Sequence, residues 1–297
     1  MRDVMKTRKL KKLQSTDELP IAPRVGIWIC LVFVVVVMGL PMLNVAAVSL
    51  SERAKSDTPG LVLFPNPVSF EGYDFIWNNR NLWRPFLTTV FVSVVGTLLH
   101  VFLSSTAGYV LIHKELPWRN ALTTFVMLTM TVPGELTLVS TYQVYRDFRL
   151  INTLTALIIN GAVGGFSVLL MRNFFSGVPA SLAEASRIDG ASDFTIFRKI
   201  YFPLSIPGIM TISTLQFIGR WNAITSVATL ISDQSKYTLP VVLRIILVDQ
   251  ASTSGTAYIF SNAKMAAVVL TALPLVILYF FTQKFFSTGV ILGATKE

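Results

Sequence analysis

Long apolar runs alternate with shorter polar segments along the whole chain. Six runs contain few charged residues and reach about 20 residues, which is enough for a helix to cross a hydrocarbon core of about 30 Å. They cover residues 26–50, 86–112, 121–144, 154–171, 206–231 and 265–286. The pattern predicts an all-α membrane protein with six transmembrane helices.

One polar segment, between the fourth and fifth predicted spans, is unusually long. Residues 179–208 are too many for a simple connection, because loops in compact domains have a median length of about 4–6 residues. Ser181 and Glu184 have the spacing of a capping box, which predicts a helix that Gly190 closes in the left-handed conformation. Asp193 is expected to cap a second short helix. The segment is therefore predicted to form two short helices joined at a glycine corner.

The composition supports a membrane protein, and the charge distribution predicts its orientation. Hydrophobic residues make up 53% of the 297 residues, charged residues make up 14%, and the mean hydropathy is +0.61. The net charge is +9, and seven Lys and Arg residues precede the first apolar run. The positive-inside rule then places the N-terminus in the cytoplasm, and alternation places the C-terminus and residues 172–205 there too. Orientation and lipid contact explain such a basic segment, so no nucleic-acid partner is expected.

The same pattern divides the chain into successive parts. They are a basic cytoplasmic arm (1–25), the first span (26–50), an extracytoplasmic segment (51–85), a core with a cytoplasmic loop (86–286, loop 176–208) and a cytoplasmic tail (287–297). Aromatic residues in the extracytoplasmic segment are expected to anchor at lipid headgroups or, alternatively, to contact an outside partner. Cys30, the single cysteine, lies in the first span, so no intrachain disulfide is expected. The first run is too long for a signal peptide and is expected to be retained.

The long polar segment carries a specific motif. Its residues are Glu184, Ala185 and Ser186, then Asp189, Gly190 and Ala191, and then Ile200 with Pro203 and Leu204. This spacing resembles the EAA loop of binding-protein-dependent ABC importer permeases, with a serine in place of the third alanine. In that family the loop couples the permease to an ATPase subunit. The alternative is an amphipathic hairpin at the membrane surface, in which Glu184 only caps its own helix.

Shorter motifs similar to those of carbohydrate-uptake permeases recur from residue 86 to residue 245. They include Val132-Pro133-Gly134-Glu135, Leu150-Ile151-Asn152-Thr153, Phe217-Ile218 with Trp221-Asn222, and Tyr237-Thr238-Leu239-Pro240. The end of the chain, Gly293-Ala294-Thr295-Lys296, resembles the G-A-x-K ending of the family. The C-terminal region looks most similar to the branch that handles complex oligosaccharides such as pectic fragments or alginate.

Polar residues inside the predicted spans are candidates for the substrate pathway, because an ionisable group within a membrane is a functional hypothesis by default. Glu135 follows a Pro-Gly pair where the helix is expected to break, so it either stabilises that break or contacts sugar. Arg220, Trp221 and Asn222 form the second candidate group. A guanidinium suits sugar hydroxyls and, better, the carboxylates of an acidic sugar. Packing against a partner subunit is the alternative for Arg220.

Two further features of the spans are expected to be structural. His100 is predicted to be an interior histidine with its hydrogen bonds satisfied. Gly161 and Gly165 have the spacing of a GxxxG helix contact.

The motifs that are missing limit the mechanism. The sequence has no G-x-x-x-x-G-K-[ST] phosphate loop, no metal-ligand cluster and no nucleophile–base–acid set, so neither a catalytic site nor a cofactor is predicted in this chain. Energy must then arrive from another polypeptide through a cytoplasmic surface.

The resemblance implies a type I ABC importer permease fold and an alternating-access mechanism for an oligo- or polysaccharide. The implied partners are a second homologous permease, two cytoplasmic ATPase subunits that bind ATP and magnesium, and an extracytoplasmic solute-binding protein. The implied location is the bacterial cytoplasmic membrane, with membrane lipid around the spans. The main alternative is a secondary transporter or channel without an ATPase, which would carry inverted repeats; none is visible in the hydropathy. A non-transporting scaffold has no sequence feature in its favour.

Overall fold

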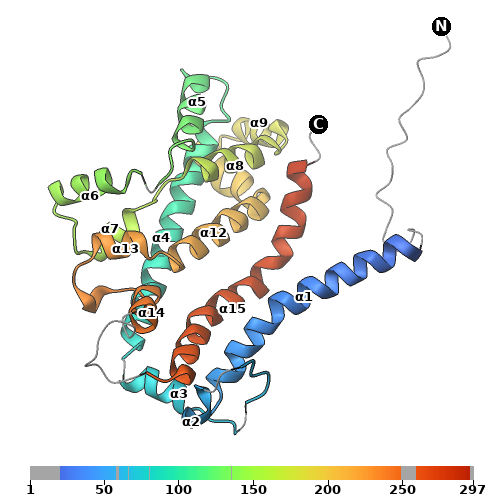
Figure 1. Cartoon of the computed structure of the whole chain (residues 1–297). Helices are drawn as coiled ribbons and strands as arrows, with labels where there is room; N and C mark the ends of the chain where they lie inside the picture. The colour runs from blue at the N-terminus through green and yellow to red at the C-terminus, as the bar shows by residue number, and fades with distance from the viewer. Residues whose placement is uncertain are drawn as a thin grey trace. The chain divides into compact units, whose positions relative to one another are not determined.

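The computed structural model describes residues 21–57, 60–65, 67–79, 81–134, 136–248 and 259–294. The described chain is helical, with one isolated β-bridge between Ser51 and Val68 (Figure 1). It forms two units, one from the residues up to Gly72 with Phe260–Ala266 and one from Tyr73–Ile259 with the chain from Ala267 onward. The elements of the first unit and of the shared last helix are α1 (Ile21–Ser49), α2 (Arg53–Ser56), α3 (Glu71–Asp74) and α15 (Ser261–Ala294).

The second unit contains the remaining helices. They are η2 (Phe75–Asn79), α4 (Trp83–Val110), α5 (Arg119–Thr129), α6 (Leu138–Asp147), α7 (Leu154–Ile159), α8 (Gly165–Ser176), α9 (Ala180–Ile188), α10 (Asp193–Ile196), η3 (Phe197–Tyr201), α11 (Phe202–Leu204), α12 (Ile206–Trp221), α13 (Thr225–Leu230), η4 (Gln234–Lys236) and α14 (Leu239–Val248). Residues 287–294 of the predicted tail continue α15. Residues 1–20 of the predicted arm and residues 295–297 lie outside the described residues.

Three described helices are long and apolar enough to cross a membrane. They cover Pro23–Ser49, Trp83–Val110 and Ser261–Phe285, and they match the first, second and sixth predicted spans. A fourth candidate is the bent pair Asp193–Leu204 and Ile206–Trp221, whose two helices meet at 79°.

The third, fourth and fifth predicted spans are each divided into two shorter helices. The pairs are α5 with α6, α7 with α8, and α12 with α13. The expected break at Pro133-Gly134 is present, but the prediction of continuous helices over 154–171 and 206–231 is wrong. The GxxxG interpretation fails for the same reason, because Gly161 lies in the break before α8 with a φ of +70°. Apolar composition alone does not reveal such breaks.

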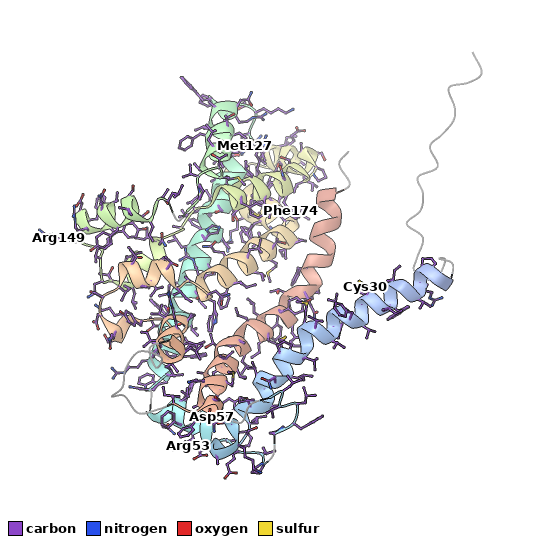
Figure 2. All side chains as sticks on the ribbon, in the orientation of Figure 1. Cys30, Arg53, Asp57, Met127, Arg149 and Phe174 are labelled. Atoms are coloured by element: carbon purple, nitrogen blue, oxygen red, sulfur yellow. The ribbon has the colours of Figure 1, made fainter. Side chains whose placement is uncertain are left out.

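The first unit is held together by polar contacts at the start of α15. The Asp57 carboxylate accepts a hydrogen bond from the Ser261 backbone N–H at 3.0 Å, and so satisfies one of the free amides at that helix end. The Arg53 guanidinium lies 3.6 Å from the centre of the Phe260 ring. Arg53 and Asp57 both come from α2 and the turn after it, as Figure 2 shows. These contacts join α2 to a helix about 200 residues further along the chain.

In the second unit, α4 is the undivided helix against which α7, α8, α12 and α14 pack (Figure 1). Among the described residues, buried apolar side chains form two clusters along it. One contains Val101, Tyr109, Met171, Phe175, Ala183, Ile196, Phe197, Tyr201, Ile209 and Ile212. The other contains Val92, Ala156, Leu157, Val227, Leu230, Ile231 and Val241. The first cluster joins the long polar loop to the span helices.

Glycine allows α4 and α8 to approach closely. A Cβ added to Gly108 would lie 2.9 Å from the Arg172 backbone nitrogen and 3.0 Å from the Val168 carbonyl oxygen. Small residues at such crossings let helix backbones meet in membranes. The ring of Phe174 on the same helix α8, labelled in Figure 2, likewise occupies the space beside Gly208 of α12.

We expect Gly108→Ala to lower the free energy of unfolding by about 1–3 kcal/mol, because the new methyl group meets the α8 backbone, which cannot move aside. Gly219→Ala is the matched control, since nothing lies within 4 Å of a Cβ at Gly219 of α12. That control should be neutral or slightly stabilising, because alanine favours a helix over glycine. The measurement is thermal unfolding of the purified protein in detergent. Equal effects of the two substitutions would contradict the close packing.

Candidate functional site

The long polar loop forms a helix, a glycine corner and a second helical segment. The first helix is α9, and the second segment runs through α10, η3 and α11 before the bend into α12. Gly190 stands at the corner with a φ of +82°, as predicted. Its N–H donates to the Arg187 carbonyl at 3.0 Å, and the Ala191 N–H donates to the Ser186 carbonyl at 2.9 Å. These two bonds are the Schellman motif, which fixes the direction in which the chain leaves α9.

Both predicted helix caps differ from the observed ones. The N-cap of α9 is Pro179, so Ser181 already lies inside the helix and the capping box with Glu184 is absent. The N-cap of the second segment is Ser192, whose hydroxyl accepts the Thr195 backbone N–H at 3.3 Å. Asp193 is the first residue within that helix, where a carboxylate still favours the helix dipole. Each helix begins one or two residues away from its predicted cap.

The loop directs a mixed apolar and acidic surface toward solvent. Glu184, Ala185 and Asp189 are exposed, and Ser186 is half-buried, while Ala183 faces the interior. Ile188 at the end of α9 is 87% exposed, and Phe194 beyond the corner is 64% exposed. Large apolar side chains grouped on a polar loop are typical of a surface that contacts another protein.

An aromatic cluster fixes this loop to the span helices. Its members are Tyr109 of α4, Phe175 of α8, and Phe197 and Tyr201 of η3. The ring centre of Tyr109 lies 5.0 Å from that of Phe197 and 5.1 Å from that of Tyr201, and Phe175 is fully buried. Aromatic pairs at these distances contribute about 0.5–1.5 kcal/mol each beyond their buried area. The loop is thereby packed against α4 and α8 as part of one apolar cluster.

A polar cleft of about 600 Å³ separates α9 from the turn that follows α4. The turn contributes His113, Lys114 and Glu115, and the loop contributes Glu184, Arg187, Asp193 and Tyr201. Arg187 and Asp193 form an ion pair at 3.0 Å across the corner; the hydrogen bond from Arg187 to that carboxylate raises the pKa of the guanidinium. Because both side chains are exposed, the pair adds little stability. Its effect is to hold two charges on either side of the glycine corner.

The predicted pathway residues do not form one group. Glu135 lies outside the described residues. Trp221 is fully buried, and its indole N–H donates to the Thr271 carbonyl at 3.0 Å. The structure therefore gives Trp221 a packing role instead of the predicted contact with sugar. Asn222 follows it as the C-cap of α12 and is exposed.

The break between α7 and α8 is held by side chains from neighbouring helices. Nδ1 of His100 lies 2.8 Å from the Gly161 carbonyl oxygen, and its Nε2 lies 2.7 Å from the Ser167 hydroxyl. The Gln216 amide also donates to the Gly161 carbonyl, at 3.3 Å. Because a carbonyl oxygen only accepts, Nδ1 carries a proton. His100 is thus an interior histidine with both nitrogens hydrogen-bonded, as predicted.

Arg220 lies in the interior of the second unit. Its side chain is almost buried, with the residue 8% exposed, and a Cβ on Gly96 of α4 would overlap the guanidinium. Nη1 donates to the Leu157 carbonyl in the last turn of α7 at 2.8 Å, while Nε and Nη2 have no hydrogen-bond partner among the described residues. A cation at this helix end satisfies a free carbonyl. Arg220 is therefore packed within its own subunit, and both alternatives for it, contact with sugar and contact with a partner subunit, stay predictions.

Sequence reasoning missed the aromatic cluster, Gln216 and the Ser192 cap. The cluster joins residues from three separate segments, so no local pattern reveals it. Ser192 stands directly before Asp193, and serine is as common a helix cap as aspartate, so it was visible as a candidate.

We expect Ser192→Ala to lower the stability of the second helical segment by about 0.5–2 kcal/mol, because the substitution removes its cap. Ser181→Ala should have almost no effect, since Ser181 lies within α9 and not at its cap. Hydrogen exchange of the backbone amides, measured by mass spectrometry on the purified protein, compares the two. The observed caps would be contradicted if exchange became faster over residues 180–188 in Ser181→Ala and stayed unchanged over residues 193–204 in Ser192→Ala. Ser181 would then be the cap of α9, as the sequence predicts.

Comparison with known proteins agrees with this fold. The family model described as "Binding-protein-dependent transport system inner membrane component" matches residues 100–291. The polygalacturonan/rhamnogalacturonan transport system permease protein YtcP of Bacillus subtilis is 32% identical over 86% of this chain and 92% of its own length. Protein LplC of the same organism is 31% identical over 86% of this chain and 89% of its own length.

A solved structure is also similar. It is the crystal structure of a bacterial ABC transporter involved in the import of the acidic polysaccharide alginate; the matched chain is 26% identical with a TM-score of 0.82, over 90% of this chain and 99% of that one. These similarities favour an ABC importer permease over a secondary transporter or channel. The chain belongs to the family of inner membrane components of binding-protein-dependent transport systems.

Proposed function

We propose that this chain is the permease subunit of an ATP-driven importer for an acidic oligo- or polysaccharide. The observation that carries the proposal is similarity over most of the chain to two transport proteins. One is named for the transport of polygalacturonan and rhamnogalacturonan, and the other is involved in the import of alginate. Polygalacturonan is a polymer of a uronic acid, and alginate is an acidic polysaccharide. A negatively charged sugar polymer is therefore the proposed cargo class.

The proposed complex contains this chain, a second homologous permease, two ATPase subunits and an extracytoplasmic solute-binding protein. The chain crosses the membrane six times with both termini in the cytoplasm. In three of the six crossings the span is built from two short helices, as in α7 with α8. The loop with Glu184, Ala185 and Ser186 then lies on the cytoplasmic side, where the ATPase subunits bind ATP and magnesium.

The proposed coupling runs from the loop to the spans by rigid contact. The ATPase subunit holds α9 by the Glu184 carboxylate and the exposed side chains of Ile188 and Phe194. When the ATPase dimer closes on ATP, α9 moves, and the cluster around Phe175 carries α4 and α8 with it. Such a loop biases the permease only through contacts that differ between two states, so stiffness at Gly190 is required.

The proposed pathway lies beside the broken spans. Discontinuous helices near the bilayer midplane commonly line transport sites, since irregular backbone is tolerated there only inside protein or beside a cavity. Asn222 is exposed at the end of α12, and Glu135 belongs to the break between α5 and α6 in sequence. Arg220 would reach a sugar carboxylate only if α4 and α12 separate. That movement would expose its Nε and Nη2 groups, which have no hydrogen-bond partner among the described residues.

We expect the reconstituted complex to hydrolyse ATP faster when its binding protein is loaded with an acidic oligosaccharide than with a neutral one of equal length. Glu184→Gln should abolish this stimulation and uptake, because loss of one partner of a desolvated interface charge pair costs about 2–5 kcal/mol. Asp147→Asn, which removes an exposed carboxylate on α6, is the control and should keep both activities. Full stimulation in Glu184→Gln would contradict the coupling role, and stimulation by neutral sugars alone would contradict the cargo class.

A further inference from the structure

A second pocket, away from the loop and the broken spans, lies at the beginning of α4. Its volume is about 380 Å³, and its polar wall is formed by Asn81, Arg84, Gln234, Ser235 and Tyr237. Val242 and Ile245 of α14 line its apolar side. In the proposed topology this pocket opens on the extracytoplasmic side, at the level where α4 enters the membrane.

The walls of this pocket are fixed by hydrogen bonds. The backbone N–H of Leu239, at the start of α14, donates to the buried Thr89 hydroxyl of α4 at 2.7 Å. The Asn152 side chain accepts the Asp233 backbone N–H at 3.0 Å, and the Lys236 ammonium donates to the Asn152 carbonyl at 2.9 Å. The segment before α14 is therefore attached both to α4 and to the turn before α7, which makes the pocket a preformed feature.

The pocket has an excess of positive charge. The neighbouring Asp233 carboxylate accepts hydrogen bonds from the Ser235 hydroxyl and backbone N–H, at 2.7 and 2.9 Å, and these bonds lower its pKa. The same carboxylate lies 3.6 Å from the Lys236 ammonium. Asp233 and Lys236 therefore form an ion pair with each other. Among the described residues that line the pocket, the charged one is Arg84. Its guanidinium lies 5.5 Å from the centre of the Trp83 ring. Because Arg84 lines the pocket, the pocket offers a cation to an anionic ligand.

We propose that this pocket binds a uronate unit of the cargo, as an outer subsite that recognises the acidic sugar before it enters the pathway. This inference rests on the proposed function. A guanidinium pairs with a carboxylate in a bidentate manner, and the amides of Asn81 and Gln234 with the Tyr237 hydroxyl provide donors and acceptors for sugar hydroxyls. The aliphatic wall of α14 covers the C–H face of a ring. The volume is at the small end of the range of about 300–1,000 Å³ for ligand pockets, which suits one or two sugar rings.

A phospholipid headgroup shares the anionic chemistry and is the competing ligand. A single phosphate would use Arg84, but it would leave the two amides and the phenol on the pocket wall with little to bind. A uronate unit uses the cation and the neutral polar groups together, so the sugar is the ligand that the lining favours.

The test is direct binding of trigalacturonate to the purified complex without its binding protein, measured by saturation-transfer-difference NMR in nanodiscs of phosphatidylcholine. The fully methyl-esterified trimer is the neutral probe of nearly the same shape. We expect saturable binding of the acid, at least tenfold weaker binding of the ester, and at least tenfold weaker binding of the acid to Arg84→Gln. Gln234→Ala, which keeps the charge, should weaken both probes. Arg146→Gln removes an exposed cation that pairs with Asp147 on α6, and it should bind the acid as the unmodified protein does.

Three outcomes would overturn the inference. Equal binding of trigalacturonate to the unmodified protein and to Arg84→Gln would remove the subsite. If Arg146→Gln weakened trigalacturonate binding as much as Arg84→Gln does, the binding would reflect general attraction between charges and not a specific pocket. Saturable binding of a short-chain phosphatidylglycerol that Arg84→Gln loses, with trigalacturonate binding unchanged, would assign the pocket to lipid. If ATP hydrolysis still responds to acid-loaded binding protein in each of these cases, the proposed function stands and the subsite alone fails.

Discussion

The structure depends on satisfying the backbone groups that are freed where a span breaks. The hydrocarbon core contains no water to bind a free carbonyl or amide, so each break needs partners within the protein. Between α7 and α8 those partners are His100 of α4 and Gln216 of α12, which meet at the Gly161 carbonyl. Arg220 does the same for the end of α7. A polar layer on α4 is therefore required by the break between α7 and α8.

This layer separates the two apolar clusters of the second unit. The cluster that contains Phe175 and Tyr201 includes the polar loop, and the cluster that contains Leu157 and Leu230 includes α7 and α13. Helix α4 contributes to both, through Val101 and Val92. A movement of α9 thus reaches α4 and α8 through close apolar packing. The second cluster, which includes α7 and α13, is connected to α9 through α4 and through the few hydrogen bonds of the polar layer.

The sequence predicted those features that a local rule determines. The helices α1, α4 and α15 follow from long runs with few charges, and the corner at Gly190 follows because its φ of +82° is one that glycine adopts without strain. Breaks within apolar runs were mostly missed, because a broken span and a continuous one have the same composition. The burial of Trp221 could not be predicted either, since an aromatic residue suits both a sugar site and a packed interior. Its partner, the Thr271 carbonyl, lies 50 residues away in sequence.

In the proposed coupling the polar loop moves as one body with helices α4 and α8. Spin labels at Ser181→Cys on α9 and Asn173→Cys on α8, both exposed positions, test it in a Cys30→Ser background by double electron–electron resonance. We expect the same distance distribution in the nucleotide-free complex and in the complex trapped with ATP and vanadate. A change between the two states on the order of a helical turn, about 5 Å, would contradict it, because α9 would then move independently of α8.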